Sequence, residues 1–240
     1  MRPDAVHRVL DAELAAARER RDGEPPRVLD VGGGSGVWAV PLAVAGCAVT
    51  VVEPSPNALA TLHRRATEAG VVDRITAVQG DTDALGADAS ADLVLGHGLL
   101  EVVDDASVAL AALAHAAAPG GAVSVLVANR YAAVLHRAIA GRLVDARRLL
   151  DDDSGQLDGT REPLLRRFDV AGLEALVQDS GLKVELLQGH GVVSDLVPGA
   201  VLEGNPGAAE SLAELELAAA TRSPLRDVAA RLHVLARRPA

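Results

Sequence analysis

Asp30 and the glycines that follow it at alternate positions form the pattern in this sequence that best predicts chemistry. Asp30 stands near the end of an apolar segment, and Gly32, Gly34 and Gly36 precede a second apolar segment. A sharp turn between a strand and a helix needs positive φ angles and must let a ligand lie against the backbone. Glycine permits both because it has no Cβ. The pattern therefore predicts a nucleotide-binding turn.

The spacing of the glycines distinguishes between cofactors. A dinucleotide turn, G-x-G-x-x-G, that starts at Gly32 requires glycine at position 37, where the chain has valine. A carboxylate just before the first glycine would repel a pyrophosphate, but it suits the ammonium group of an amino acid. Both observations disfavour a dinucleotide-dependent oxidoreductase. The alternative interpretation is a structural turn that binds no ligand.

The acid and the G-x-G-x-G spacing resemble motif I of the class I S-adenosylmethionine-dependent methyltransferases. The resemblance implies an α/β fold, a Rossmann-like seven-stranded and mostly parallel sheet with helices on both faces and with strand 7 antiparallel. It also implies S-adenosylmethionine as the cofactor. The cofactor contacts that it implies in this segment are Asp30, Gly32, Gly33, Gly34 and Gly36.

Polar residues after the next two expected strands extend the predicted site. Glu53 ends a β-branched segment 21 residues after Gly32, an interval that places a carboxylate on ribose hydroxyls. A solvated strand end is the alternative for Glu53. The following strand leads into a corner that holds the adenine in the methyltransferase family, although an ordinary polar turn is also consistent with it. The candidates in that corner are Asp81, Thr82 and Asp83.

Alternating apolar and amphipathic segments predict a doubly wound sheet. Strands are expected at residues 27–31, 48–53, 75–79, 91–95, 122–127, 183–187 and 232–237. Helices are expected at residues 4–20, 37–45, 56–69, 106–118, 170–180 and 208–220. The Pro-Gly-Gly sequence at 119–121 is expected to form a turn before the fifth strand.

The chain is interpreted as a single methyltransferase domain, residues 1–240. Residues 1–25 are expected to form an N-terminal helical cap, which the family resemblance places across the cofactor cleft. Residues 131–167 and 193–224 are insertions near the carboxyl ends of strands, where open α/β sheets bind ligands. We therefore expect both insertions on the substrate side, although the leucines of the 208–220 helix favour packing against the core or a partner.

Composition is consistent with one α/β domain. The chain has 240 residues, 49% of them hydrophobic, and it lacks an apolar run of about 18 residues that would cross a membrane. The N-terminus also lacks the apolar core of a signal peptide, so a cytoplasmic protein is expected. The one cysteine, Cys47, excludes an internal disulfide and a clustered thiolate site, and no metal is expected.

A more specific resemblance begins after the fourth expected strand. Residues 96–105 and 127–141 are similar to the bacterial tRNA 5-carboxymethoxyuridine methyltransferases. The resemblance implies that His97 contacts the cofactor or shapes its methionine end, and that Arg2 contacts the cofactor. The alternative for His97 is a structural histidine. The alternative for Glu101 is a carboxylate that stabilises a helix N-terminus. The candidate catalytic residues are His97, Glu101, Asn129 and His136.

The acceptor decides whether a general base is needed. Methyl transfer from a sulfonium is an in-line displacement, so the nucleophile must be held near the methyl carbon. A carboxylate is already ionised near pH 7, whereas a hydroxyl or amine would be helped by His97, His136 or Glu101. An acidic acceptor needs cationic anchors. The candidates in or beside the first insertion are Arg130, Arg142, Arg161, Arg166 and Arg167.

Charge disfavours nucleic acid as a general ligand. The net charge is −10 and residues 151–153 are consecutive acids, whereas nucleic-acid affinity depends on cationic contacts to phosphate. Three aromatic residues, Trp38, Tyr131 and Phe168, leave little for stacking on bases. Three functions remain open: a small-molecule methyltransferase, a tRNA uridine-acid methyltransferase, and a non-catalytic cofactor-binding protein of the same fold. The sequence indicates no particular oligomeric state.

Overall fold

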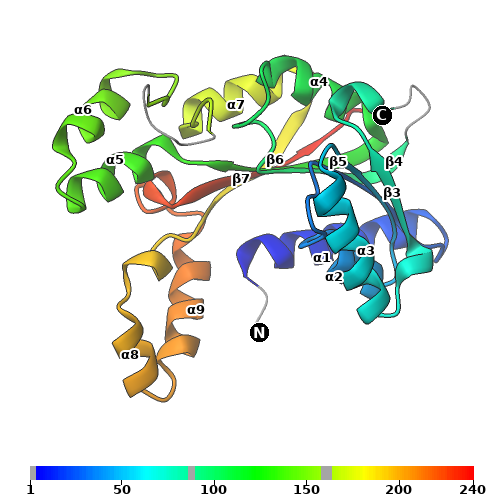
Figure 1. The fold of residues 1–240 in the computed structure, drawn as a ribbon, viewed down its shortest axis with the longest axis horizontal. Helices are drawn as coiled ribbons and strands as arrows, with labels where there is room; N and C mark the ends of the chain where they lie inside the picture. Colours follow the sequence, from blue (N-terminus) through cyan, green and yellow to red (C-terminus); the bar gives the residue numbers. More distant parts are fainter. Residues whose placement is uncertain (1–3, 86–89, 158–163) are drawn as a thin grey trace.

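A seven-stranded sheet organises the molecule (Figure 1). This computed structural model describes residues 4–85, 90–157 and 164–240. The strands are β1 (Arg27–Val31), β2 (Ala48–Glu53), β3 (Ile75–Gln79), β4 (Ala91–His97), β5 (Ala117–Ala128), β6 (Lys183–His190) and β7 (Arg231–Arg237). Their order across the sheet is β3-β2-β1-β4-β5-β7-β6. β7 is antiparallel to β5 and β6, and the other neighbouring pairs are parallel. The fold class predicted from the sequence is confirmed.

The helices cover both faces of the sheet (Figure 1). Apolar residues of α1 (Ala5–Arg20), α2 (Ala39–Val44) and α3 (Pro56–Glu68) share one core cluster with the sheet. Those of α4 (Ala106–Ala116) and α7 (Val170–Asp179) share the other. The remaining elements are α5 (Arg130–Ile139), α6 (Leu143–Asp151), α8 (Gly199–Gly204), α9 (Ala208–Ala219), and the 3-10 turns η1 (Val72–Arg74), η2 (Thr82–Ala84), η3 (Ser194–Leu196) and η4 (Arg226–Val228). Within the described ranges, we find no helix with the length and apolar character of a membrane span.

Alternation along β5 assigns its side chains to the two faces. Val123 and Val125 belong to the core cluster under α4 and α7, whereas Ala122 and Leu126 belong to the cluster under α1. Successive residues of a strand point to opposite faces. Ser124 therefore faces α1, and it is polar although Ala122 and Leu126, its neighbours along the strand on that face, are apolar.

Helix starts follow the local chemistry of the sequence. The Asp4 carboxylate accepts a hydrogen bond from the His7 N–H at 2.9 Å and begins α1. Asp105 begins α4 in the same way, by accepting from the Ser107 N–H at 2.8 Å. A side-chain oxygen at this position satisfies a backbone donor that has no partner within the helix. These helix starts agree with the expected ones to within one residue.

The fifth strand differs from the expectation. α4 ends at Ala116, and β5 begins at once, so Ala117 pairs with Ala91. The register shifts between Ala91 and Leu93, and residues 119–121 form an irregularity inside the strand instead of the expected turn. Proline lacks the N–H that a regular ladder needs. Backbone bonds at 2.9 and 3.0 Å between Arg238 and the two glycines keep the segment in the sheet.

The two insertions have different structures. The first contains α5 and α6, which pack through a small apolar cluster that includes Ala133, Leu149 and Leu157. The second contains η3, α8 and α9, and α8 and α9 project away from the sheet as a pair (Figure 1). Glu216 on α9 holds this segment to the end of β6 by accepting bonds from the backbone N–H groups of residues 192–194 at 2.6–2.8 Å.

Candidate cofactor and acceptor site

The glycine turn follows β1 and has a backbone that only glycine adopts readily. The φ angles of Gly32, Gly34 and Gly36 are 69°, 56° and 79°. The Gly32 N–H donates to the Val52 carbonyl at 2.8 Å, which ties the turn to β2. A Cβ at Gly36 would collide with Leu62 of α3. The turn thus has one packed side and leaves its backbone open for a ligand.

Asp30 lies beneath the turn, where it is 1% exposed. A Cβ at Gly33 would lie 2.5 Å from Asp30 Oδ2, so glycine lets the backbone rest on the carboxyl group. Burial, and then the charge of Glu53, raise the pKa of Asp30 to about 7. Oδ2 is buried and has no hydrogen-bond partner among the described residues. An ammonium group at this position would supply the missing partner and stabilise the ionised form.

Glu53 ends β2 and holds the turn from the other side. Its Oε2 accepts from the Gly34 N–H at 3.0 Å, and its Oε1 accepts from the Ser55 N–H at 2.9 Å. A carboxylate oxygen has more than one acceptor site. Glu53 therefore has acceptor capacity left for ribose hydroxyls, and the ribose contact expected from the sequence stays a prediction.

The corner after β3 lies next to the end of β2. The Gly80 N–H donates to the Glu53 carbonyl at 3.3 Å. Asp81 accepts from the Asp83 N–H at 3.0 Å and so begins η2, and Thr82 is half-buried between these two exposed acids. The structure places this corner beside the glycine turn, but the hydrogen bond within it also fits an ordinary polar turn. Arg2, the other expected cofactor contact, lies outside the described residues.

His97 ends β4 and begins a row of hydrogen-bonded side chains on the α1 face. Its Nε2 lies 2.8 Å from Ser124 Oγ of β5, which lies 2.8 Å from His233 Nε2 of β7. His233 Nδ1 lies 2.9 Å from Gln188 Nε2 of β6. Burial is the main cause that lowers the pKa of His233 to about 3 and the pKa of His97 well below its usual range. Both rings are therefore neutral near pH 7.

An aromatic stack connects His97 with α1. The rings of His97 and Trp38 meet edge to face with centroids 4.6 Å apart, and the His7 ring lies 4.6 Å from Trp38 on a tilted plane. Asp4 Oδ2 lies 3.8 Å from His190 Nδ1 at the end of β6. The first turn of α1 thus lies against the carboxyl edge of the sheet beside His97.

Glu101 lies in the segment that follows β4 and is 2% exposed. Its Oε1 accepts from the Ala128 N–H at 3.2 Å, while Oε2 is buried with no hydrogen-bond partner in the described part of the chain. Burial raises the pKa of Glu101, and the positive charge of Arg231 opposes this effect. Leu99, between His97 and Glu101, touches the glycine turn, since a Cβ at Gly32 would lie 3.2 Å from Leu99 Cδ1.

Asn129 and His136, the other two candidate catalytic residues, lie at the start of α5 and on α5. The Asn129 amide donates to the carbonyls of Asp227 and Ala229 at 2.9 and 2.7 Å, and its oxygen accepts from the Tyr131 N–H at 3.0 Å. These bonds use both amide hydrogens, so Asn129 holds η4 against the start of α5. His136 is exposed on α5. The bonds of Asn129 are thus to the protein backbone, and the catalytic roles expected for Asn129 and His136 stay predictions.

The arginines expected as anchors in the first insertion are engaged with the protein. Arg130 is buried and pairs with Asp169 at 2.6 Å and with Asp153 at 2.9 Å. Arg142 pairs with Asp145 at 2.6 Å. Arg166 and Arg167 donate to backbone carbonyls, among them those of Leu100 and Gly155 at 2.7 Å, and Arg161 lies outside the described residues.

Arg231, at the start of β7, is the cation that the structure brings to the site. It pairs in register with Ala128 of β5 and His190 of β6 at the carboxyl edge of the sheet. Its charge is near enough to lower the pKa of both His97 and Glu101. Arg231 is exposed and has no ion-pair partner among the described residues. The sequence signal for it is the alternation of Arg231 and His233, which places both on one face of a strand.

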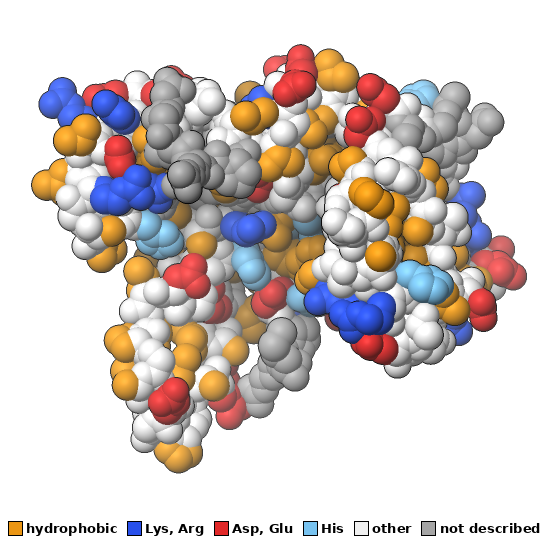
Figure 2. All heavy atoms as spheres, in the orientation of Figure 1, with side chains coloured by type: hydrophobic (Ala, Val, Ile, Leu, Met, Phe, Trp, Pro, Cys, Tyr) orange, Lys and Arg blue, Asp and Glu red, His pale blue; other side chains and the backbone are white. Residues whose placement is uncertain are grey.

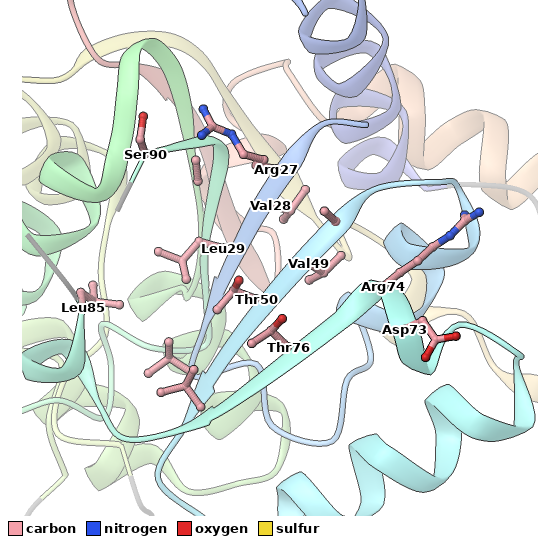
Figure 3. A pocket seen from close by; sticks show the side chains of 14 residues that line it. Arg27, Val28, Leu29, Val49, Thr50, Asp73, Arg74, Thr76, Leu85 and Ser90 are labelled. Carbon is pink, nitrogen blue, oxygen red and sulfur yellow. The ribbon is translucent and has the colours of Figure 1, made fainter. Parts of the chain in front are cut away.

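A groove of about 510 Å³ lies elsewhere on the sheet (Figure 3). Most of its lining comes from the amino-terminal halves of β1, β2 and β3, with Thr50 and Thr76 on its floor and Arg27 at one end. The glycine turn follows the carboxyl end of β1 instead, so we separate this groove from the cofactor site. In the described ranges there is no group of three or more acidic, histidine or cysteine side chains arranged to hold a metal ion.

Known proteins resemble this chain in sequence and in architecture. A family model described as a methyltransferase domain matches residues 4–187. The chain is similar to the tRNA 5-carboxymethoxyuridine methyltransferase of Escherichia coli K12, with 30% identity over 117 residues, 48% of this chain and 45% of that protein. It is also similar to a ubiquinone biosynthesis O-methyltransferase of Azorhizobium caulinodans, with 34% identity over 127 residues, 52% of this chain and 49% of that protein. The matches thus span about half the length of these relatives.

A solved structure extends the similarity over almost the whole chain. The S-adenosylmethionine-dependent methyltransferase from Mesorhizobium loti superposes with a TM-score of 0.63 at 21% identity, and covers 96% of both chains. At this identity the superposition shows the fold. The glycine turn with its buried acid, the strand order and the family match over residues 4–187 lead to one conclusion. The chain belongs to the class I S-adenosylmethionine-dependent methyltransferases.

Proposed function

We propose that this methyltransferase forms a methyl ester on a small acceptor that carries a carboxylate. The observation that carries the proposal is Arg231, an exposed cation without an ion-pair partner in the described residues, beside His97 and Glu101. A guanidinium is a strong partner for a carboxylate because it offers two parallel N–H donors. The bound cofactor supplies an electrophilic methyl group.

The cofactor fits the first part of the site. Asp30 Oδ2, which has no hydrogen-bond partner in the described part of the chain, is suited to the ammonium group, and the Glu53 carboxylate is suited to the ribose hydroxyls. β4 is the neighbour of β1 in the sheet, and Leu99 touches the turn. The segment 97–101 therefore borders the cofactor on the side away from β2.

The second part of the site suits an anionic acceptor. Arg231 lies on β7, two strands away from β4, at the same edge of the sheet. A carboxylate bound there is already ionised near pH 7, so the transfer needs orientation and no proton removal. Burial raises the pKa of Glu101, and a proton on its buried Oε2 would be donated to the acceptor as a hydrogen bond.

Surface charge favours a small acceptor over tRNA. The net charge is −10, and on the face shown in Figure 2 the Lys and Arg side chains form separate groups among acidic ones. Counterion release from phosphates needs several cations in a connected patch. A tRNA-borne carboxylate is the alternative, and the E. coli relative named for 5-carboxymethoxyuridine favours it. A non-catalytic cofactor-binding protein is the other alternative.

Radiolabelled S-adenosylmethionine tests the proposal. The chain is incubated with the tritium-methyl cofactor and with matched pairs of small carboxylic acids and phenols, and in parallel with total tRNA. We expect label that mild alkali releases as volatile methanol, which is the signature of a methyl ester. Label in alkali-stable products, or in tRNA alone, would overturn the proposal, and no label with any acceptor would favour the non-catalytic alternative.

A matched pair of arginine variants tests the anchor. Arg231→Gln should raise the acceptor KM roughly tenfold or more, because a charge-assisted hydrogen bond is lost. Arg64→Gln on α3 removes the same charge from an exposed helix pair and should leave the acceptor KM unchanged. Equal effects of the two variants would show that Arg231 acts only through net charge.

A further inference from the structure

The row Gln188–His233–Ser124–His97 is polar and lies beside apolar residues of the α1 face, among them Leu95, Leu126 and Leu235. Ser124 and His233 are 0% exposed and Gln188 is 3% exposed. Polar groups without partners are costly in such a place, so the bonds within the row are strongly favoured. One nitrogen is left over: Nδ1 of His97 is buried and has no hydrogen-bond partner among the described residues.

The bonds of this row have one direction. A neutral imidazole has one donor nitrogen and one acceptor nitrogen, and a hydroxyl has one proton. Gln188 Nε2 is a donor, so His233 Nδ1 accepts and the His233 proton is on Nε2. That proton is donated to Ser124 Oγ, and the single proton of the buried Ser124 hydroxyl has His97 Nε2 as its acceptor in the row. The proton of the His97 ring is then on Nδ1.

We infer that this row, by fixing the His97 tautomer, makes His97 Nδ1–H a hydrogen-bond donor to an oxygen of the acceptor, and that Ser124, His233 and Gln188 are positioning residues for it. The inference rests on the proposed function and deepens it. A donor at Nδ1 selects acceptors that present a carboxylate or carbonyl oxygen. It also means that His97 does not serve as a general base, because Nδ1 has no free lone pair.

The His97 ring belongs to an aromatic stack. Trp38 contacts the His97 ring, and His7 contacts Trp38. Because Nδ1 is buried, an acceptor oxygen can bond it only after neighbouring side chains move. Arg231, at the same edge of the sheet, then holds the acceptor from a second direction.

NMR of the ¹⁵N-histidine-labelled protein tests the tautomer without any acceptor. Long-range proton–nitrogen correlations show which nitrogen of each neutral ring carries the proton, and a single His→Gln variant assigns each ring. We expect His97 protonated at Nδ1 and His233 protonated at Nε2. A His97 ring protonated at Nε2 would overturn the inference.

Two variants test the relay. Gln188→Glu replaces the donor with an acceptor and should reverse every bond, so that the His97 proton moves to Nε2. Ser124→Ala removes the link and should leave His97 with both tautomers populated. Ser180→Ala is the control, since it removes a hydroxyl that bonds the Val177 carbonyl at the end of α7. His97 spectra unchanged in both folded relay variants would contradict the inference, and if Gln188→Glu does not fold, Ser124→Ala decides.

Kinetics and cofactor binding separate this inference from the proposed function. Ser124→Ala should lower kcat with the acid acceptor roughly ten- to hundredfold, as expected when a hydrogen bond to a charged group is weakened, and leave the cofactor Kd unchanged. The wrong tautomer in a protein that still binds S-adenosylmethionine and forms methyl esters would overturn the relay alone. The expected tautomer in a protein that forms no methyl ester would overturn the proposed function.

Discussion

The carboxyl groups of Asp30 and Glu53, at the ends of neighbouring strands, interact strongly enough that the charge of Glu53 adds to burial in raising the pKa of Asp30 to about 7. Glu53 is held by two backbone N–H groups, whereas Asp30 Oδ2 has no partner in the described residues. Glu53 therefore stabilises the turn, and the Asp30 carboxyl group is available to bind a cation.

The first prediction concerns stability and pH. The pKa of Asp30 is about 7 in the folded protein and about 3.9 in the unfolded chain, so between these values the folded state binds more protons. The contribution of Asp30 to the free energy of unfolding therefore falls as pH rises from about 4 to about 7, and changes little above that. The side chain of the Asp30→Asn variant does not ionise, so the variant should not lose this free energy of unfolding as pH rises. It should therefore be more stable than the parent at pH 8.

Thermal unfolding between pH 4 and pH 8 checks this prediction. The expected stabilisation by Asp30→Asn at pH 8 is on the order of a few kcal/mol, and it should disappear near pH 4. Asp179→Asn, at the exposed end of α7, is the control. A stability difference that does not change with pH would contradict the assigned burial of an ionising group.

The second prediction separates the two ends of the cofactor. Asp30→Asn should weaken S-adenosylhomocysteine binding roughly ten- to hundredfold, because it loses a charged partner for the ammonium group. It should leave binding of methylthioadenosine, which has no amino-acid part, unchanged. Glu53→Gln should weaken both ligands, since both contain the ribose. Calorimetry with the two ligands measures this, and equal losses for both ligands in Asp30→Asn would argue against the ammonium contact.

The third prediction concerns the contact between Gly33 and Asp30. A Cβ at position 33 would lie 2.5 Å from Asp30 Oδ2 and 2.9 Å from Val51 Cγ1. Gly33→Ala should therefore destabilise the protein by roughly 1–3 kcal/mol, the usual cost of overpacking, and reduce cofactor affinity. Gly199→Ala is the control, because an added Cβ there meets no atom within 4 Å. Urea unfolding of both variants gives the comparison, and similar midpoints would show that the turn adapts.

The fourth prediction concerns how α1 is fixed. Glu13 on α1 is 6% exposed and accepts two bonds from Arg237 of β7, at 2.7 and 2.8 Å, and one from Arg20 at 2.7 Å. Burial is the largest single influence on the pKa of Glu13 and raises it. The hydrogen bonds from Arg237 and then from Arg20 act in the opposite direction, and together with the charges of these arginines they lower the pKa overall. Glu13→Ala should cost roughly 1–3 kcal/mol, because it removes a buried carboxylate that accepts charged hydrogen bonds and leaves Glu185 as the remaining ion-pair partner of Arg237.

Chemical denaturation measures this loss. Glu68→Ala, which breaks an exposed pair with Arg64 on α3, should change the free energy of unfolding by less than about 1 kcal/mol. Comparable effects of the two substitutions would show that Glu13 behaves as a surface residue.

The sequence predicted those parts of the molecule that depend on local pattern. The apolar strand segments, the glycine turn with Asp30, and Glu53 at the end of β2 all follow from residues near one another in the chain, and the strand order follows from family resemblance. The irregularity at 119–121 was mispredicted, because a Pro-Gly-Gly sequence forms a turn in isolation, and here the partner strands and Arg238 keep it in the sheet.

The acceptor side could not be predicted in the same way. Ser124 and His233 are 109 positions apart, and only the sheet order brings them together. The arginines of the first insertion have a plausible spacing for anion binding, but Arg130 is used by Asp153 and Asp169. Arg231 was not predicted as an anchor, because the expected strand began one residue after it.

The bond from the Gly34 N–H to Glu53 has a consequence for the speed of binding. This bond, at 3.0 Å, restrains the turn against the end of β2 through the protein's own residues. Four of the five residues 32–36 are glycines. Their conformational entropy is thus lost when the protein folds and not when the ligand binds. Cofactor association should therefore proceed as a one-step encounter, without a slow loop-ordering phase.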